Sequence, residues 1–410
     1  MARGPYIRIA GQLEVQVSAL TGAGSIGNYN MHAVARIVHK DRVYEVPIMT
    51  GNAMKHWHAY YTAQVYQSLG GQKLNEFCKK GIGLRGYTAD SSLTSPREAG
   101  SESQAIEDLC NDLHGFLLPR GGRAAGEEEE EEERKSVKKR KRGEEAREVP
   151  VKRDSLIKFS FIIPVLDERN LEIVSKFAVT HNRVDPRPIE ETQMMVFKQE
   201  YATASYGFNS SLDLAYVCKP IYEEVSAESM SLQKGSQKRF PQQEVSTMYC
   251  DVNEVARRVR SAILAFINLL LAPGAKQARA LPIIKVKELF AVVANKPIPS
   301  VISGAYSDYM EKSLRILADY YKALSASGSK DDALELKIYC YSESAEKCSN
   351  LHDEWQNIIK TSEKTGEFSK MYQQKSAEGE CKGETFKVCT SFSSLIKELA
   401  DDSVKYVDSK

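Results

Sequence analysis

Three polar side chains near the start of one segment have the types and the spacing to bind an anion. Asn52, Lys55 and His56 follow Thr50, whose hydroxyl can accept a hydrogen bond from an amide of the first turn and so begin a helix. The start of a helix presents free amide groups and the positive end of the helix dipole. This combination favours the binding of a nucleic-acid phosphate. An ordinary amphipathic helix with a solvated polar face would show the same pattern, and the segment alone leaves both interpretations open.

The same segment predicts which face of the helix is packed. The helix is expected to end near Gly70 and Gly71. At about 100° per residue, one stripe of larger apolar side chains is predicted to pack on a sheet. This stripe consists of Met54, Trp57, Tyr61 and Val65. Ala59 and Ala63 lie beside the polar cluster and are small enough to let a large ligand approach. His58 lies close to the apolar stripe, and we predict that it is packed and makes no ligand contact.

A glycine-rich segment, residues 21–32, is the second candidate for ligand binding. Its glycines let the backbone approach a ligand closely and present consecutive amides. The segment lacks the Lys-Ser/Thr ending of a P-loop and the spacing of a dinucleotide fingerprint, so we expect no nucleotide cofactor. The candidate contact residues in this segment are Ser25, Asn28, Tyr29 and His32.

The overall composition is that of a globular protein without a membrane segment. The chain has 410 residues, enough for two average domains or for one domain with insertions. Lys and Arg number 56 against 55 for Asp and Glu, which counts against a nucleic-acid binder unless the basic residues are clustered. There is no N-terminal hydrophobic signal, and the longest apolar run, residues 262–272, is too short to span a bilayer. We expect a cytoplasmic location.

The eight cysteines include no Cys-x-x-Cys pair, which disfavours a zinc ribbon or a redox motif. The plain interpretation is reduced, mostly buried thiols in a cytoplasmic protein. If the source is a hyperthermophile, Cys340 with Cys348 and Cys381 with Cys389 could form bridges. No His-x-x-x-His motif or carboxylate cluster indicates a metal site, so we expect neither a metal nor a catalytic centre.

Periodicity predicts six main elements in the order β-α-β-β-α-β. They are a strand at 6–20, a helix at 51–69, a strand at 156–166, a hairpin at 176–208, a helix at 252–271 and a strand at 281–293. This order is shared by ferredoxin-like and RNA-recognition folds and predicts an α+β class. The core would consist of residues 1–69 and 153–300, with an insertion at 70–152 and a helical and strand extension at 301–410. On the second helix, Arg257, Arg258 and Arg260 are predicted to face outward.

Charged residues mark a loop and further candidate contacts. Within residues 120–152, seven glutamates (127–133) precede a basic run (138–142) with no apolar anchor, which predicts a disordered surface loop. The basic half also resembles a nuclear-import signal. Other basic or polar candidates for binding lie beside this loop, along the hairpin, and in the loop after the second helix. They are Lys152, Arg153, His181, Arg183, Gln193, Lys198, Lys276 and Arg279, and the apolar Met194 of the hairpin is a further candidate.

Several motifs together resemble one protein family. The motifs occupy residues 24–28, 46–58, 112–116, 181–185 and 199–208, and the lysine-histidine motif on the helix is the most specific. They are similar to the archaeal branch of the DevR family (Cas seven), which supplies the backbone subunit of CRISPR Cascade complexes, most similar here to type I-A. The resemblance covers roughly residues 5–305.

The resemblance implies a hand-like, modified RNA-recognition fold with a palm and a thumb. It implies an antiviral-defence protein that binds guide RNA (crRNA) without catalysis, and whose copies line up along the RNA as a helical oligomer. The implied partners are crRNA, target DNA through the guide, other copies, the cap, large and small Cascade subunits, and a helicase-nuclease. The glycine-rich segment and the helix with Asn52, Lys55 and His56 would touch RNA phosphates. The hairpin would be the thumb, which inserts between bases.

Two other functions remain open at this point. One is a metal-independent endoribonuclease in which His56 or His58 is the general base and Lys55 stabilises the scissile phosphate. Two histidines two residues apart on a helix point about 200° apart, so they cannot easily share one phosphate. The other is a regulator of its own operon, as the family name suggests, although the sequence shows no helix-turn-helix.

Overall fold

The computed structural model describes most of the chain. The described residues are 4–16, 24–26, 29–31, 33–119, 150–174, 179–183, 195–199, 203–222, 250–271, 284–326, 334–364 and 380–408. The predicted charged loop (127–142) lies outside them, as do Asn28, His32, Gln193, Met194, Lys276 and Arg279. None of the described helices is long and apolar enough to cross a membrane.

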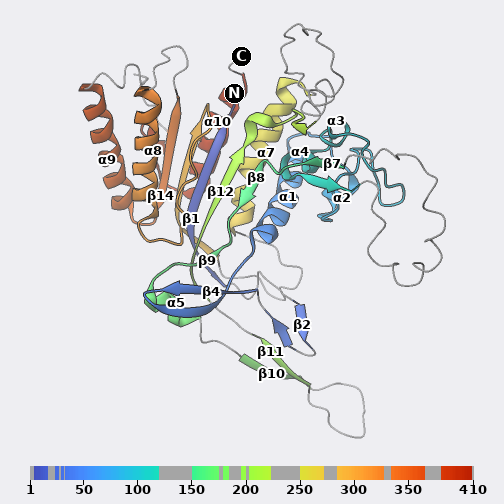
Figure 1. Cartoon of the computed structure of the whole chain (residues 1–410), viewed down its shortest axis with the longest axis horizontal. Coiled ribbons are helices and arrows are strands. Elements are labelled where there is room, and N and C mark those ends of the chain that lie inside the picture. Colours follow the sequence, from blue (N-terminus) through green and yellow to red (C-terminus); the bar gives the residue numbers. More distant parts are fainter. Residues whose placement is uncertain are drawn as a thin grey trace, which may run out of the picture.

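A central sheet organises the molecule (Figure 1). Its strands are β1 (Tyr6–Gln16), β8 (Ile157–Phe159), β9 (Ile163–Pro164), β12 (Thr203–Asp213), β13 (Ile284–Ala294), β14 (Leu336–Ser342), β15 (Cys381–Lys382) and β16 (Phe386–Cys389). The order is β15-β16-β14-β13-β1-β12-β8, with β9 also on β12. Neighbours are antiparallel except for β14 and β16. The class is therefore α+β, as predicted.

Three smaller sheets and a set of helices surround this sheet. The smaller sheets contain β2 (Gly24–Ile26), β3 (Tyr29–Met31), β10 (Val179–Arg183) and β11 (Met195–Gln199); β4 (Val34–His39) and β5 (Arg42–Pro47); and β6 (Phe116–Leu118) and β7 (Val151–Arg153). The helices are α1 (Gly51–Ser68), α2 (Glu76–Lys79), α3 (Glu102–Ala105), α4 (Leu109–His114), α5 (Glu168–Val174), α7 (Val252–Leu271), α8 (Tyr309–Ala326), α9 (Ala345–Lys364) and α10 (Phe392–Asp408).

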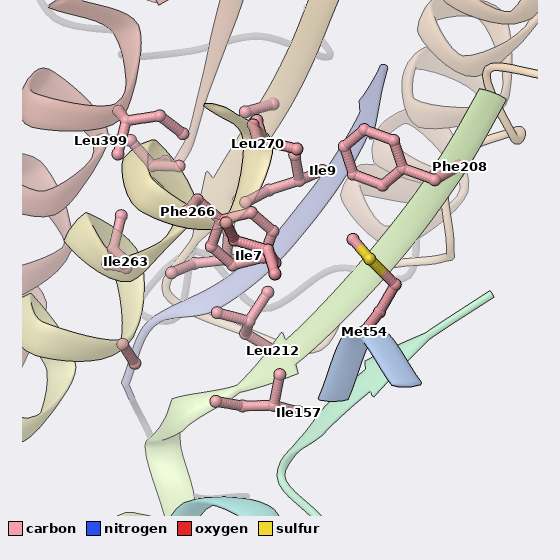
Figure 2. Packing of buried hydrophobic residues seen from close by; sticks show 14 of the residues in the cluster. Ile7, Ile9, Met54, Ile157, Phe208, Leu212, Ile263, Phe266, Leu270 and Leu399 are labelled. Carbon is pink, nitrogen blue, oxygen red and sulfur yellow. The ribbon is translucent and has the colours of Figure 1, made fainter. Parts of the chain in front are cut away.

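Side chains alternate across the central strands and build a core on each face. On β1, Ile7 and Ile9 point to the face covered by α1, α7 and α10. Figure 2 shows these two residues packed with Phe266 and other side chains of that cluster. Tyr6 and Ala10 belong to the opposite cluster, under α8 and α9. The sheet is thus the middle of three layers.

The face opposite α1 and α7 is also crossed by an irregular segment, residues 298–305. Arg8 Nη2 donates to the Ile298 carbonyl (2.9 Å), and Gln12 Nε2 donates to the Gly304 carbonyl (2.9 Å). On the other side, the Gly304 amide donates to the Phe208 carbonyl (3.1 Å). The segment therefore lies over β1 and β12, and together with α8 and α9 it closes this face of the sheet.

The six predicted elements are present with changed bounds. They correspond to β1, α1, β8 with β9, the β10–β11 hairpin followed by β12, α7, and β13, and the central four strands lie in the order β13-β1-β12-β8. The predicted hairpin 176–208 divides, because β12 pairs with β1 in the central sheet while β10 and β11 form part of another sheet. β14 and β16, from the predicted extension, continue the central sheet beyond β13.

The expectation of reduced thiols is wrong. All eight cysteines are buried and paired, as Cys78–Cys110, Cys218–Cys250, Cys340–Cys348 and Cys381–Cys389. The two short-range pairs are those that the sequence left open as an alternative. The other two join cysteines 32 residues apart, which only the tertiary structure brings together.

Candidate nucleic-acid interface

The start of α1 has the predicted cap. The Thr50 hydroxyl accepts a hydrogen bond from the Ala53 amide (3.3 Å). Asn52, in the first turn, is exposed, and Lys55 and His56 are half-buried in the next. The three predicted phosphate ligands of this helix therefore lie on consecutive turns at its amino-terminal end.

The buried face of α1 is rotated by about one residue from the predicted face, so this prediction is wrong. Met54 is buried as expected, but Trp57, Tyr61 and Val65 are partly exposed. The buried stripe consists of Gly51, Met54, His58, Ala59, Thr62, Ala63 and Tyr66. This face includes polar groups that are hydrogen-bonded internally, which a pattern of apolar residues cannot reveal. Ala59 and Ala63 are buried in the core.

His58 is a packed histidine, as predicted. Its Nε2 donates to the Ala262 carbonyl on α7 (2.8 Å), so its Nδ1 accepts, from His114 Nε2 (2.9 Å). Burial lowers the pKa of His58 to about 4, and burial together with the Arg85 charge lowers the pKa of His114 well below its usual range. Both rings are therefore neutral at pH 7. Because His58 is fully buried and both its ring nitrogens are engaged, it cannot serve as a general base for RNA.

Lys55 is a half-buried cation that has no acidic partner among the described residues. Within the described part of the chain it makes no hydrogen bond or ion pair. Burial, followed by the positive charge of Arg85, lowers its pKa to about 8. Burial destabilises the charged form of this lysine, and a bound anion would stabilise it. Arg85, in the insertion, is a neighbour that the sequence analysis missed.

The glycine-rich segment and the predicted thumb meet in one small sheet, β10-β11-β3-β2. Lys198 on β11 pairs with Tyr29 on β3 and, on its other side, with Thr180 on β10. His181 and Arg183 also lie on β10, and Ser25 lies on β2. Figure 1 shows this sheet projecting beyond one end of the central sheet. Two candidate sites that are far apart in the sequence therefore lie on neighbouring strands of one sheet.

The prediction for Arg153 is corrected by its environment. Its side chain is fully buried, with Nη2 2.6 Å from Asp112 Oδ1 and Nη1 2.9 Å from Glu102 Oε1. It also donates to the carbonyls of Asp112, Tyr216 and Lys219. All three nitrogens are thus engaged by the protein, and Arg153 joins the insertion to the segment that follows β12. Lys152 is exposed, with its Nζ 4.3 Å from the centre of the Tyr222 ring.

One group of possible metal ligands comes together among the described residues, namely Cys78, Asp108 and Cys110. The two cysteines form a disulfide, so neither offers a thiolate. The Asp108 carboxylate accepts hydrogen bonds from the amides of Asn75 (2.8 Å) and Asn111 (2.9 Å). This group is therefore a structural element.

Comparisons with known proteins give a consistent result. A family model described as "CRISPR-associated negative auto-regulator DevR/Csa2" matches residues 9–314. A Thermoproteus tenax protein named CRISPR-associated protein Cas7/Cst2/DevR is 45% identical over 334 residues, which cover 79% of this chain and 85% of that protein. A Methanocaldococcus jannaschii protein of the same name is 28% identical over 77% of this chain and 90% of its own length.

A third relative comes from Saccharolobus solfataricus. It is named CRISPR-associated aCascade subunit Cas7/Csa2 2 and is 26% identical over 72% of this chain and 80% of its own length. Among solved structures, a chain of a "CRISPR RNA-guided surveillance complex" is 10% identical, with a TM-score of 0.38, over 97% of this chain and 99% of that one. A TM-score at that level supports no conclusion.

Proposed function

Because this chain belongs to the DevR/Csa2 family of CRISPR-associated proteins, we propose that it binds guide RNA as the repeated backbone subunit of a Cascade complex. The name of the Saccharolobus relative as an aCascade subunit supports this assignment. Copies of the chain would line up along the RNA and join other Cascade subunits, and the guide would pair with target DNA.

The observation that carries the proposal is the unpaired Lys55 at the capped start of α1. RNA phosphates are the anions that this cation, the exposed Asn52 and the helix dipole would attract. Contacts to phosphates fix the position of a nucleic acid but do not read its sequence. Binding of this kind suits a guide RNA, whose bases must remain available for pairing.

The closed sheet face supports the same mode of binding. The strand order β13-β1-β12-β8 suits an RNA-recognition-like core. Such modules usually stack bases on the open face of their sheet. Here residues 298–305, α8 and α9 cover that face. RNA would therefore bind outside the sheet, along α1 and the small sheet of β2, β3, β10 and β11, with the β10–β11 hairpin as the thumb.

We propose a binding role without catalysis. The endoribonuclease alternative would have to rely on His56 alone, because His58 is buried and internally hydrogen-bonded. Autoregulation is a second candidate, favoured by the description of the matching family as a negative auto-regulator. Autoregulation would require binding to duplex DNA, and the test below distinguishes it from the binding of guide RNA.

We expect the protein to bind unrelated single-stranded RNAs with similar affinity and with a steep loss of affinity as salt rises, because phosphate contacts release counterions. Lys55→Met should lower the RNA affinity about tenfold at low salt. It should also make the affinity less dependent on salt, because about one counterion fewer is released on binding. Fluorescence anisotropy with labelled RNAs at two salt concentrations measures both quantities.

The matched control is Lys312→Met on α8, an exposed lysine whose Nζ lies 2.8 Å from Asp308, and it should bind RNA as the natural chain does. Tight binding of one RNA sequence that is insensitive to salt would contradict the proposal. Preference for a promoter duplex over single-stranded RNA would instead support autoregulation.

The lowered pKa of Lys55 predicts opposite effects on stability and binding. Its pKa lies near 8 in the folded chain, against about 10.4 when unfolded, so the folded state disfavours the cation. The stability cost is complete below pH 8 and disappears as pH rises towards 10.4. Lys55→Met should therefore raise the free energy of unfolding at pH 7 by on the order of 1 kcal/mol, although it weakens RNA binding.

Two measurements check this prediction. Urea unfolding at pH 7 and pH 10 should show the stability gain of Lys55→Met shrinking at the higher pH. RNA affinity of the natural chain should fall between pH 7 and pH 9, whereas that of the variant should change little. A variant that is less stable than the natural chain at pH 7 would show that Lys55 has an acidic partner.

A further inference from the structure

A short loop of the insertion, residues 81–86, lies against the start of α1. A Cβ built on Gly83 would lie 3.7 Å from His56 Nδ1, so the loop backbone passes within van der Waals reach of that ring. Gly81 has a φ of +64°, and a Cβ built on it would lie 2.7 Å from Cδ2 of the Tyr60 ring of α1. A larger residue would be strained at Gly81 and would collide with Tyr60. The glycines thus allow a close approach between loop and helix.

Both ends of this loop are fixed, whereas its middle has free donors. The Ile82 amide donates to the Phe77 carbonyl (2.8 Å), and the Gly86 amide donates to Asn111 Oδ1 (2.8 Å). The Cys78–Cys110 disulfide ties α2, just before the loop, to α4. In contrast, none of the described residues accepts a hydrogen bond from the amides of residues 83–85.

A small cleft separates the loop from the helix. It is lined by His56, Tyr60, Gly83 and Arg85, together with Ala59, Cys78, Gly81, Ile82, Leu84 and Cys110. The cleft leaves about 10 Å³ for the centre of a water-sized group, which is room for one oxygen atom. It is therefore too small for a base or a sugar, and it fits a single oxygen of a larger ligand.

The charges around the cleft are predominantly positive. Arg85 Nη1 donates to the His114 carbonyl (2.8 Å), which leaves other N–H groups of the guanidinium available. Lys55 is close enough for Arg85 to perturb it. Asp108 is the carboxylate whose charge acts on Arg85. It is buried and accepts hydrogen bonds from two backbone amides. Arg85 thus lines the cleft, Lys55 lies within the range of its charge, and neither makes an ion pair with the described residues.

We propose that loop 81–86 is the second wall of the phosphate site, and that one phosphodiester oxygen enters the cleft between Arg85 and His56. The guanidinium of Arg85 and amides of the loop donate to this oxygen, while Lys55 contacts the same phosphate from α1. The inference rests on the proposed RNA-binding function and adds a binding residue and a binding loop to it. The ligand chemistry is an oxyanion of a phosphodiester, and free inorganic phosphate shares that chemistry.

The test uses three variants of the full chain, measured with labelled single-stranded RNA by anisotropy and with thermal unfolding in parallel. Arg85→Gln should lower RNA affinity about tenfold and reduce the salt slope by about one ion. Gly83→Ala should weaken binding severalfold at unchanged melting temperature, because the added methyl narrows the cleft yet meets only His56, at an ordinary distance. Arg97→Gln is the control, since it removes the same charge from an exposed pair with Asp90 in the same insertion.

The outcomes separate the two proposals. If Lys55→Met weakens RNA binding while Arg85→Gln and Gly83→Ala bind as the natural chain does, the loop is not part of the site and the RNA-binding function stands. If Lys55→Met also has no effect, the proposed function fails as well. Should Arg85→Gln fold poorly, Gly83→Ala decides alone. Inorganic phosphate, added against sodium chloride at equal ionic strength, should compete only weakly; strong competition would assign the cleft to a free phosphate and overturn the RNA assignment.

Discussion

Replacing Arg258 with methionine is expected to lower the free energy of unfolding by about 3–5 kcal/mol. The guanidinium is fully buried, with Nη1 2.7 Å from Asp112 Oδ2 and Nε 2.9 Å from Glu254 Oε1. It also donates to the carbonyls of Ile106 (2.8 Å) and Glu107 (2.7 Å). Methionine fits the volume, but it removes the positive charge and the hydrogen-bond donors that the buried carboxylates of Asp112 and Glu254 face. It also leaves the two carbonyls without a donor.

The neighbouring arginine provides the control. Arg257, one residue away on α7, is one-third exposed and pairs with the same Glu254 (2.6 Å). Because Arg257 is partly exposed to water and Glu254 keeps its ion pair with Arg258, Arg257→Met should cost about 1 kcal/mol or less. Urea unfolding of both variants at pH 7 measures the difference. A loss for Arg258→Met no larger than that for Arg257→Met would show that the buried network does not hold the insertion to α7.

Gly304→Ala is the second change with a large expected effect. A Cβ there would lie 2.0 Å from the Gly11 carbonyl oxygen and 2.6 Å from its carbon. Both are backbone atoms of β1 at the centre of the sheet, so the collision cannot be relieved by a side-chain rotation. We expect a loss of about 3 kcal/mol or more, because overpacking against backbone requires the segment 298–305 to move off the sheet.

Gly83→Ala is the matched substitution for this experiment, because its Cβ meets nothing closer than 3.7 Å. Thermal unfolding should separate the two alanine variants clearly. If Gly304→Ala melts at the temperature of the natural chain, the segment does not pack on β1 and β12 as described. The argument that the sheet face is closed to RNA would then fail with it.

The order of the main elements could be predicted from the sequence because it depends on local periodicity. The long alternation of β1 is typical of a strand, and the apolar stripe of α7 recurs at helical spacing. The division of the hairpin could not be predicted in this way. Residues 195–199 and 203–213 have similar strand patterns, and only their partners, β10 and β1, place them in different sheets.

Buried polar residues were the hardest residues of the site to predict, and of the three below only His58 was predicted to be packed. His58, Arg153 and Arg258 are residue types that usually face water, and each is buried here because the fold supplies its hydrogen-bond partners. Those partners come from distant parts of the chain, such as Ala262 and Asp112. For the same reason the apolar pattern of α1 predicted Tyr61 and Val65 on the packed stripe and missed Thr62 and Tyr66.

The loop with Arg85 was missed although a signal was present. Residues 81–86 read Gly-Ile-Gly-Leu-Arg-Gly, three glycines around one arginine, in a segment that otherwise shows no periodicity. Glycines with an adjacent cation are typical of loops that approach an anion closely. Only the structure shows that the loop faces His56, because the contact depends on the disulfide and the hydrogen bonds that fix the ends of the loop.

The most direct test of the central claim is to locate the RNA on the protein. Ultraviolet cross-linking of the natural chain to single-stranded RNA, followed by mass spectrometry of the linked peptides, should find them in α1 and in residues 80–86. The partly exposed Trp57 and Tyr60 offer reactive rings beside Lys55. Lys55→Met should reduce the cross-links at both places together. Cross-links concentrated on the central strands β1, β12 and β13 instead would contradict the account, because they would place the bases on the face that residues 298–305 and α8 cover.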